Sequence, residues 1–540
     1  MLGIYIIIFV VMGIVLIYSL YKMKRSLHML QQNLYNENNR YLNWVSDNKK
    51  EIFLNLDAYG ILFTILFAWC VNTYIAYYFV FIIIVLYVLC ARNIHKERLA
   101  DQNKKPLVYT ARIKRLIVTN VILYLIPCIL GIVIREHLCD FIILLSVMAV
   151  LSFYVTFLAK VINTPIEKLV YKHYERAAKK KLKSMPNLKI VGITGSYGKT
   201  SSKNVLADVL NVKYNTLPTP KSINTFNGLM TVINNKLTKF DDVFIAELGA
   251  YVKGEINGLC KLVNPKYGII TTIGTAHLAT FGSEENIQTG KMELIEYLPQ
   301  DGVGVLNRDD PKQVSYKIKN DNPCKILWIG IDTKDEVDVR ASKIKCSSEG
   351  TKFVVEFKGD KKKYDFETRL LGKHNVYNII SALALGKEFG ISIKDLQNSV
   401  KKVKTVEHRL SMKEFPNFTF IDDAYNSNPV GAKGALDVLN MMDGYKVVVT
   451  PGMIELGDKQ DELNREFGRQ ISEVADKVIL VGEKQTKPIL KGLKDKKYKD
   501  EDIIVINDVV KAYEILSTIK SKKHIYALFE NDLPDTYNEK

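Results

Sequence analysis

Long runs of apolar residues fill the first third of the chain, whereas shorter apolar runs separated by polar stretches fill the remainder. A helix of about 20 apolar residues is long enough to cross the hydrocarbon core of a bilayer. The pattern therefore predicts a transmembrane region over residues 1–160 with four or five helices. These helices are expected at approximately residues 2–20, 55–70, 74–91, 116–134 and 141–159.

The number of spans depends on residues 59–90, which are largely uncharged but interrupted by Asn72 and Thr73. A tight hairpin of two helices suits this length better than one overlong helix and gives five spans, whereas a single helix gives four. A cleaved signal peptide is disfavoured for residues 2–20, because no basic segment precedes this run and no small-residue cleavage site follows it.

Basic residues are distributed unevenly between the apolar runs. Segment 91–115 is rich in Lys and Arg, whereas segment 135–140 holds only Arg135. Basic loops stay on the cytoplasmic side of a membrane. We therefore expect a multi-pass protein of the cell membrane, in contact with the lipid bilayer, whose domains after Lys160 are cytoplasmic. No charged residue lies deep within a predicted span, which argues against an ion path.

Beyond the apolar third, a basic helical linker is expected over residues 161–186. Alternating positions in residues 338–370 predict a small antiparallel ribbon, and the strands and helices after about residue 404 predict a doubly wound parallel sheet. The expected fold is therefore multi-domain. It has an N-terminal α-helical membrane domain, an α/β P-loop ATPase core over residues 187–403 and a C-terminal α/β Rossmann-like domain over residues 404–540.

Composition narrows the classes of partner. The net charge is +17, but the cations flank apolar runs or lie in polar loops, and no basic stripe is interleaved with aromatic residues. Nucleic acid is therefore not expected as a partner. The seven cysteines form no CxxC pair and no metal-ligand spacing, which suits a reducing compartment.

A glycine-rich turn after the β-branched run at residues 190–193 carries the clearest chemistry. A strand, a loop and a helix N-terminus in this order bind phosphate through backbone amides. Lys199 is expected to contact the β- and γ-phosphates and Thr200 to ligate Mg²⁺. Ile193 occupies the position of the first Gly in the full P-loop pattern, so only GxxGKT is present. The expected nucleotide contacts here are Gly195, Ser196, Tyr197, Gly198, Lys199, Thr200 and Ser201.

Two later strands end in polar residues. Glu247 ends an apolar strand, where a carboxylate can reach a metal ion beside the phosphates, and His277 follows another. Each residue also has an ordinary interpretation, a solvated carboxylate for Glu247 and an interior histidine for His277.

These motifs and several later ones resemble one family. The first three are TGSYGKT, ELGAYVKGEI and IGTAHLATFGSEENIQTGKMEL, and the later ones are LLGKHNVYNIISALA, EHRL, IDDAYNSNPVGAKGAL and PGMIELGD. In this order they resemble the Mur ligases of cell-wall synthesis, especially the branch that adds D-alanyl-D-alanine to a UDP-N-acetylmuramoyl-tripeptide (MurF). The resemblance implies an ATP-dependent carbon–nitrogen ligase acting in peptidoglycan synthesis.

The resemblance also implies roles for single residues. Glu247 and His277 resemble Mg²⁺ ligands, and Lys291 resembles a lysine that is carbamoylated and bridges a second Mg²⁺. An ammonium would be repelled by two dications, whereas a carbamate is an anionic oxygen ligand. Asn375 and Asn378 resemble adenine contacts. The remaining implied contacts are Arg409 with a nucleotide phosphate, Asp423 with the nucleotide, and Asn224 with the γ-phosphate. The implied catalytic residues are Lys199, Lys291, His277 and Arg409.

The implied reaction activates a carboxylate. The acceptor carboxylate of a muramoyl peptide attacks the γ-phosphate, and the amine of D-Ala-D-Ala then attacks the acyl-phosphate. ADP, phosphate and an amide are the products.

Three differences from the family pattern leave more than one possible acceptor and amine substrate. Apolar spans replace the usual N-terminal substrate domain, Asn464 stands where the branch has His, and FENDLPDTY replaces a glycine-rich basic ending. The acceptor is either UDP-linked or lipid-linked, and the amine is D-Ala-D-Ala, another amino acid or ammonia. One alternative is a membrane-anchored ligase for a poly-γ-glutamate-type acceptor. Another is a P-loop ATPase that energises a membrane complex, although it would not need the set of Glu247, His277 and Lys291.

Overall fold

The computed structural model of the chain folds as two units, Met1–His173 and Tyr174–Lys540. It describes residues 2–33, 35, 39–53, 55–100, 106–135, 137–321, 323–347, 349–405, 409–424, 428–454, 456 and 459–531.

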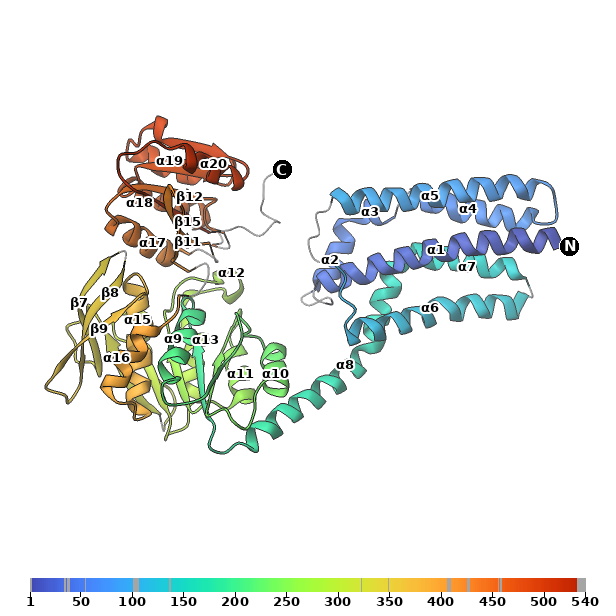
Figure 1. Ribbon diagram of the computed structural model, residues 1–540. Helices are drawn as coiled ribbons and strands as arrows, with labels where there is room; N and C mark the ends of the chain where they lie inside the picture. The colour runs from blue at the N-terminus through green and yellow to red at the C-terminus, as the bar shows by residue number, and fades with distance from the viewer. Residues whose placement is uncertain are drawn as a thin grey trace. The chain divides into compact units, whose positions relative to one another are not determined.

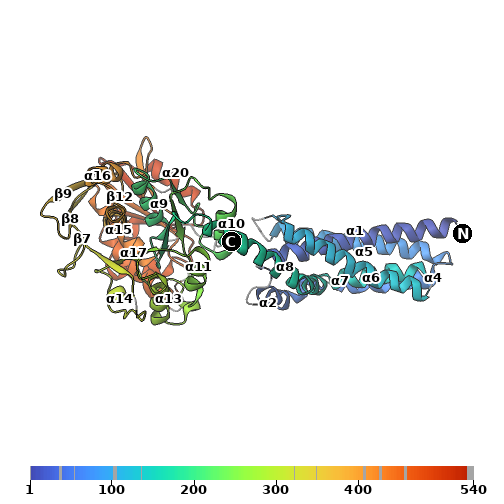
Figure 2. The same cartoon turned by 90° about the horizontal axis from the view of Figure 1, so that it is seen from below.

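The regular elements of the first unit are all helices in the part of the chain that the structure describes. Helix α1 packs against α5 and α7, and α4 pairs with α5. Helices α1, α4, α5 and α6 run alongside one another in two views (Figures 1 and 2). The helices are α1 (Leu2–Gln32), α2 (Arg40–Asp47), α3 (Lys49–Ile52), α4 (Asn55–Cys70), α5 (Ile75–Ala100), α6 (Ala111–Arg135), α7 (Leu138–Val150) and α8 (Ser152–Lys183), the last of which continues into the second unit.

Three helices among the described residues are long and apolar enough to cross a membrane, namely Gly3–Gln32, Ile75–Arg92 and Ala111–Ile134. The apolar run expected at residues 141–159 is divided between α7 and α8, which meet at an angle of 81°, and a fourth span results only if this bent pair crosses as one. The region expected to hold a hairpin contains α4 and α5, although α4 is shorter than the spanning helices.

An ion pair lies buried among these apolar helices. Lys22 Nζ donates to Asp57 Oδ2 at 2.7 Å, and both side chains are only 2% exposed. Lys22 also donates to the carbonyl of Ile52 at 2.9 Å, and Tyr18 donates its hydroxyl to Asp57. Hydropathy did not indicate this pair, because Lys22 follows one apolar run and Asp57 opens the next.

The second unit begins with the middle domain, whose described strands form one nine-stranded sheet in the order β2-β3-β1-β4-β5-β6-β7-β8-β9. The first seven strands of this order pair in parallel, and β7 to β9 form the antiparallel ribbon expected from the sequence. The strands are β1 (Lys189–Thr194), β2 (Thr216–Pro218), β3 (Val243–Glu247), β4 (Tyr267–Ile270), β5 (Val303–Asn307), β6 (Lys325–Gly330), β7 (Val339–Ser347), β8 (Gly350–Phe357) and β9 (Lys363–Thr368).

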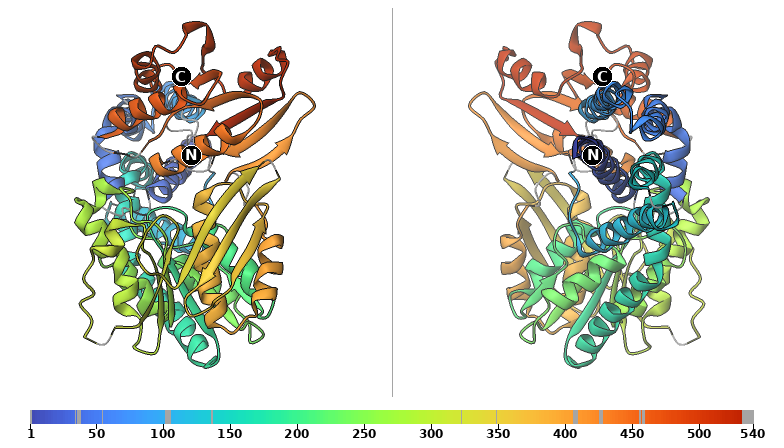
Figure 3. Two further views of the ribbon diagram at one scale, coloured as in Figure 1. Left: turned by 90° about the vertical axis from the view of Figure 1, so that its left-hand side faces the viewer. Right: turned by 90° about the vertical axis from the view of Figure 1, so that its right-hand side faces the viewer.

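Helices cover both faces of this sheet (Figure 3). On one face, α9, α15 and α16 bury a continuous apolar core, and α13 lies on the other face against β1 and β4. The helices are α9 (Lys199–Leu210), α10 (Phe226–Asn235), α11 (Glu255–Val263), α12 (Leu278–Phe281), α13 (Glu284–Tyr297), α14 (Pro311–Val314), α15 (Lys373–Glu388) and α16 (Ile393–Lys402).

The C-terminal domain has a sheet of order β10-β11-β15-β12-β13-β14 within its described residues, parallel except for β10. Helices α17, α18 and α19 cover one face and α20 the other, as expected for a doubly wound sheet. The elements are β10 (Ser411–Glu414), β11 (Phe418–Asp423), α17 (Pro429–Met441), β12 (Tyr445–Thr450), α18 (Gln460–Ser472), β13 (Lys477–Val481), α19 (Lys487–Asp495), β14 (Ile503–Ile506), α20 (Val510–Thr518) and β15 (Ile525–Glu530).

Candidate active site

The glycine-rich loop joins β1 to the N-terminus of α9, as the motif predicts. Gly195 has φ 147°, and a Cβ there would lie 2.0 Å from Thr271 Oγ1, so only glycine fits. Gly198, with φ 80°, is the N-cap of α9, which makes Lys199 the first helical residue. Lys199 Nζ donates to the carbonyls of Gly195 at 2.7 Å and Ser196 at 3.1 Å. The carbonyls of the loop therefore hold the Lys199 ammonium close to the N-terminus of α9, and a helix N-terminus favours the binding of anions.

The carboxylate of Glu247, at the end of β3, accepts hydrogen bonds from three side chains. Its Oε2 accepts from Thr200 Oγ1 at 3.0 Å and from Lys203 Nζ at 3.0 Å, and its Oε1 accepts from Asn224 Nδ2 at 3.2 Å. Both Glu247 and Lys203 are 1% exposed. Lys203 was not among the residues expected from the sequence, although it lies one helical turn after Lys199 and so on the same face of α9.

His277 lies just before α12 in the left-handed region, with φ 60°. Its ring is 4.5 Å from the ring of Tyr251, measured between centroids. Burial, with the nearby Lys291 and Lys199 cations, lowers the pKa of His277 to about 4. The imidazole is therefore neutral at pH 7 and has a lone pair to offer a metal ion.

Lys291 lies on α13 and is 1% exposed. Its Nζ donates to the carbonyl of Ala250 at 3.1 Å and stands 5.1 Å from the ring centroid of Phe281. The helix approaches β1 closely, since a Cβ on Gly192 would lie 2.9 Å from Leu294. Burial, reinforced by the Lys199 cation, lowers the pKa of Lys291 to about 7. A substantial fraction of this amine is thus uncharged near neutral pH.

Many of these residues meet in one cavity of about 380 Å³. Side chains from both the middle and the C-terminal domains contribute to it, and Lys291 is buried outside the lining. The lining includes Ser196, Lys199, Thr200, Asn224, Glu247, Tyr251, His277, Arg409, Asn428 and Ile454.

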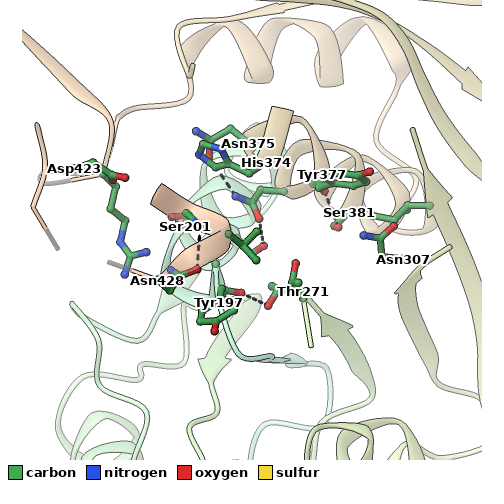
Figure 4. Close-up of a pocket in the computed structure, with 18 of the residues that line it drawn as sticks. Tyr197, Ser201, Thr271, Asn307, His374, Asn375, Tyr377, Ser381, Asp423 and Asn428 are labelled. Carbon is green, nitrogen blue, oxygen red and sulfur yellow. Dashed lines mark hydrogen bonds between the residues drawn. The ribbon is translucent and has the colours of Figure 1, made fainter. Parts of the chain in front are cut away.

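A second cavity of about 130 Å³ adjoins the loop and is shown in Figure 4. Asn375 and Asn378, the predicted adenine contacts, both line it, and the amide of Asn378 also joins α15 to α9. Asn378 Oδ1 accepts from Ser202 Oγ at 2.6 Å, and Asn378 Nδ2 donates to Asn375 Oδ1 at 3.2 Å. Further lining residues that the sequence analysis did not single out are Thr271, Asn307, His374, Tyr377 and Glu530. Asn307 ends β5, so the rule used for Glu247 would have found it.

Arg409 and Asp423 bring the C-terminal domain to this second cavity, and Arg409 lines both cavities. Asp423 Oδ1 accepts from the backbone N–H of Leu410 at 3.1 Å. Burial raises the pKa of Asp423 to about 6. Asp423 therefore lines the cavity beside Leu410, the residue that follows Arg409.

Asn464 lies at a described position, whereas several other motif residues lie outside the described residues. Asn464 lies 3% exposed, accepts from the N–H of Met453 at 2.8 Å and donates to its carbonyl at 2.9 Å. It therefore holds the loop that carries Ile454 into the first cavity. Parts of the EHRL, DDAYNSNP and MIELG motifs lie outside the described residues, as does most of the FENDLPDTY ending. The motif residues concerned are Glu407, His408, Tyr425, Asn426, Ser427, Glu455 and Gly457.

Comparison with known families gives the same assignment as the motifs. Residues 193–386 match the Mur ligase middle domain, and residues 408–528 match the Mur ligase, glutamate ligase domain. The chain carries the middle and C-terminal domains of a Mur ligase. These matches confirm the predicted family and the α/β folds predicted for the middle and C-terminal domains, and the membrane domain stays a prediction.

Two relatives that match these Mur ligase domains carry the same enzyme name. The UDP-N-acetylmuramoyl-tripeptide--D-alanyl-D-alanine ligase of Bacillus subtilis is 33% identical over 299 residues, which cover 54% of this chain and 63% of that protein. Its namesake from Escherichia coli is 30% identical, with 54% and 64% covered. The chain thus spans less than two thirds of the length of these relatives.

Solved structures agree with the Mur ligase fold. A crystal structure of MurF from Acinetobacter baumannii has a TM-score of 0.60 at 26% identity, covering 66% of this chain and 77% of that one. MurF from Thermotoga maritima in complex with ADP has a TM-score of 0.59 at 26% identity, covering 67% and 80%.

Proposed function

We propose that this protein is an ATP-dependent ligase of cell-wall precursor synthesis that adds D-Ala-D-Ala to a muramoyl peptide. The observation that carries this proposal is the first cavity, where the phosphate loop, Glu247, His277 and Arg409 meet. The relatives of the two domains, which are named for this activity, support the same choice.

ATP would bind across the two cavities. Its base would lie among the amides and rings of the second cavity, and its phosphates on the loop amides and the N-terminus of α9. Lys199 can turn from the carbonyls of Gly195 and Ser196 to the phosphates, and Arg409 lines both cavities from the C-terminal domain. These two cations would stabilise the charge on the transferring phosphoryl group.

The residues around Glu247 fit a magnesium ion. No cluster of three or more His, Cys, Asp or Glu side chains suited to a metal occurs among the described residues. Mg²⁺ in phosphoryl-transfer sites needs only one or two carboxylates, because water and phosphate oxygens complete its shell. Thr200 and Glu247 would hold one ion and the neutral His277 a second, and the metal would supply charge neutralisation for the phosphates.

Lys291 fits the proposed carbamate. Carbon dioxide adds to an uncharged amine, and burial lowers the pKa of Lys291 to about 7. The modified side chain would present anionic oxygens to the second magnesium ion, in place of an ammonium that would repel it.

The reaction would proceed in two steps. The acceptor carboxylate attacks the γ-phosphorus of ATP, which forms a carbonyl phosphate and releases ADP. The amine of D-Ala-D-Ala then attacks the acyl carbon, and phosphate leaves with the electron pair of the broken C–O bond. Lys199 and Arg409 hold the phosphoryl oxygens during the first step.

The apolar helices support a multi-pass location in the cell membrane with the ligase domains in the cytoplasm. A lipid-linked acceptor is a second candidate substrate, favoured by the three helices that are long and apolar enough to cross a bilayer.

The test is phosphate release by the full chain in detergent with Mg-ATP, bicarbonate and UDP-muramoyl-tripeptide, with or without D-Ala-D-Ala. Release that needs both substrates and yields the pentapeptide supports the proposal, and Lys199→Ala should abolish it while the loop variant Lys361→Ala leaves it unchanged. Phosphate release only with a lipid-linked acceptor would identify that acceptor as the substrate in place of the UDP-linked one. Phosphate release that needs neither substrate would refute the proposal of a ligase.

A further inference from the structure

A groove runs along the first unit between helices α1 and α5, which lie side by side in Figures 1 and 2. Its volume is about 480 Å³, within the range that holds an organic ligand of moderate size. Most of the α1 residues that line it recur every three or four positions, so they share one face of the helix. The lining residues are Ile14, Ile17, Tyr18, Leu20, Tyr21, Lys24, Tyr87, Val88 and Ala91.

Two tyrosines that contact the buried polar cluster form the floor of this groove. Tyr18 and Tyr87 are each 3% exposed, and their ring centroids are 4.8 Å apart. Tyr18 donates its hydroxyl to Asp57, the partner of Lys22, and Tyr87 donates to Ser146 Oγ at 3.0 Å. Because both hydroxyls have partners within the helical unit, the floor offers mainly ring carbon atoms to a ligand.

The rims of the groove are apolar, and its charge lies at one end. Ile17, Leu20 and Val88 are 70%, 48% and 58% exposed. Lys24 is also exposed, and among the described residues of the lining it is the only one that carries a charge. The groove therefore joins a long apolar surface to a single cation.

The charged end is the one expected on the cytoplasmic side. Helices α1 and α5 run in the same direction, because they meet at their starts, where a Cβ on Gly3 would lie 3.8 Å from Tyr77 Oη, and again at the floor tyrosines. Ala91 therefore lies at the same end as Lys24. The basic segment 91–115, which is expected in the cytoplasm, begins at this end.

The length of the groove indicates which kind of lipid fits it. From Ile14 to Lys24 the groove follows α1 for about 15 Å, which is half of the hydrocarbon thickness of about 30 Å. A single leaflet therefore contains the whole groove. A phospholipid acyl chain has this reach when its phosphate lies at the interface, and anionic phospholipids of the cytoplasmic leaflet attract lysines there.

We propose that the groove between α1 and α5 binds one acyl chain of an anionic phospholipid of the cytoplasmic leaflet, with the lipid phosphate on the Lys24 ammonium. The ion pair of Lys22 and Asp57 holds the floor on which the chain lies. This assignment rests on the proposed membrane location and is independent of the ligase reaction.

A tryptophan on the rim tests the proposal with brominated lipids, whose bromine atoms quench a nearby indole. Val88→Trp is made in a chain whose three tryptophans are replaced by Phe. The chain is reconstituted in phosphatidylcholine bilayers with a small fraction of brominated phosphatidylglycerol or brominated phosphatidylcholine. The matched reporter is Val118→Trp on α6, because Val118 is 59% exposed and lies one helical turn from Lys114, as Val88 lies one turn from Arg92.

The measured quantity is the ratio of quenching by phosphatidylglycerol to quenching by phosphatidylcholine. This ratio should be about fivefold higher at position 88 than at position 118, since one lysine beside an anionic lipid supplies roughly that factor. Lys24→Ala should make the two ratios equal. The control Lys168→Ala removes an exposed lysine of α8 and should leave both ratios unchanged.

Equal ratios at positions 88 and 118 without Lys24→Ala overturn the proposal, as does a ratio at position 88 that Lys24→Ala does not change. Excess unbrominated phosphatidylglycerol should restore the fluorescence. Recovery at a lower concentration of a polyprenyl phosphate would assign the groove to an isoprenoid chain and overturn the proposal. If Val88→Trp fails to fold, Ile17→Trp on the opposite rim replaces it. A chain that alkaline carbonate removes from membranes refutes the proposed membrane location, and the lipid site with it.

Discussion

Removal of the Lys203 ammonium should destabilise the middle domain strongly. Lys203→Met leaves the Glu247 carboxylate, which is 1% exposed, without its buried cation. Loss of one partner of a buried ion pair costs about 3–5 kcal/mol. The lower end applies here, because Glu247 keeps its bonds from Thr200 and Asn224. For a domain of this size, about 3 kcal/mol corresponds to a fall in Tm of roughly 6–12 °C.

The chain contains three tryptophans, of which Trp328 lies in β6 of the middle domain. Thermal unfolding followed by Trp328 fluorescence, in a background of Trp44→Phe and Trp69→Phe, therefore reports on this domain. Lys236→Met, which changes an exposed lysine, should stay within about 0.5 kcal/mol of wild type.

A double-mutant cycle with Glu247→Gln sharpens the test. When Glu247→Gln has removed the negative charge, Lys203→Met no longer leaves a buried carboxylate without a cation. The loss of unfolding free energy in the double variant should therefore be smaller than the sum of the two single losses by about 1–3 kcal/mol. Additive effects, or a fall in Tm of less than about 2 °C for Lys203→Met alone, would refute the reasoning.

Three further predictions concern single residues. Gly195→Ala should abolish nucleotide binding in calorimetry, because its Cβ would lie 2.0 Å from Thr271 Oγ1 at φ 147°; retained affinity would contradict this loop geometry. Carbon-13-labelled bicarbonate should give a carbamate NMR signal that grows as pH rises through about 7, where Lys291 loses its proton, and that is absent in Lys291→Met. The His277 ring should titrate near pH 4 by NMR; because this pKa lies below the ordinary 6.5, its contribution to stability is complete above pH 6.5 and is lost as pH falls toward 4. A midpoint near 6.5 would contradict its burial.

The parts of the site that sequence reasoning predicted are local in the chain. The phosphate loop follows from consecutive residues, and Glu247 and His277 follow from the rule that parallel strands end at one edge of a sheet. Lys203 and Glu530 were missed because their places in the site depend on neighbours far away in sequence, Glu247 in one case and Asp423 in the other. The division of an apolar run at Leu151 was missed because hydropathy records composition and not helix direction.

The two carbonyl contacts of Lys199 have a consequence for turnover. The Lys199 ammonium would give up its hydrogen bonds to two loop carbonyls in order to bind a phosphate. The net gain in binding free energy is therefore smaller than the number of phosphate contacts suggests. The same alternative partners would be available when a bound nucleotide departs, which would lower the barrier to its release. A loop built in this way favours exchange of nucleotide over tight retention, as the proposed ligase reaction requires.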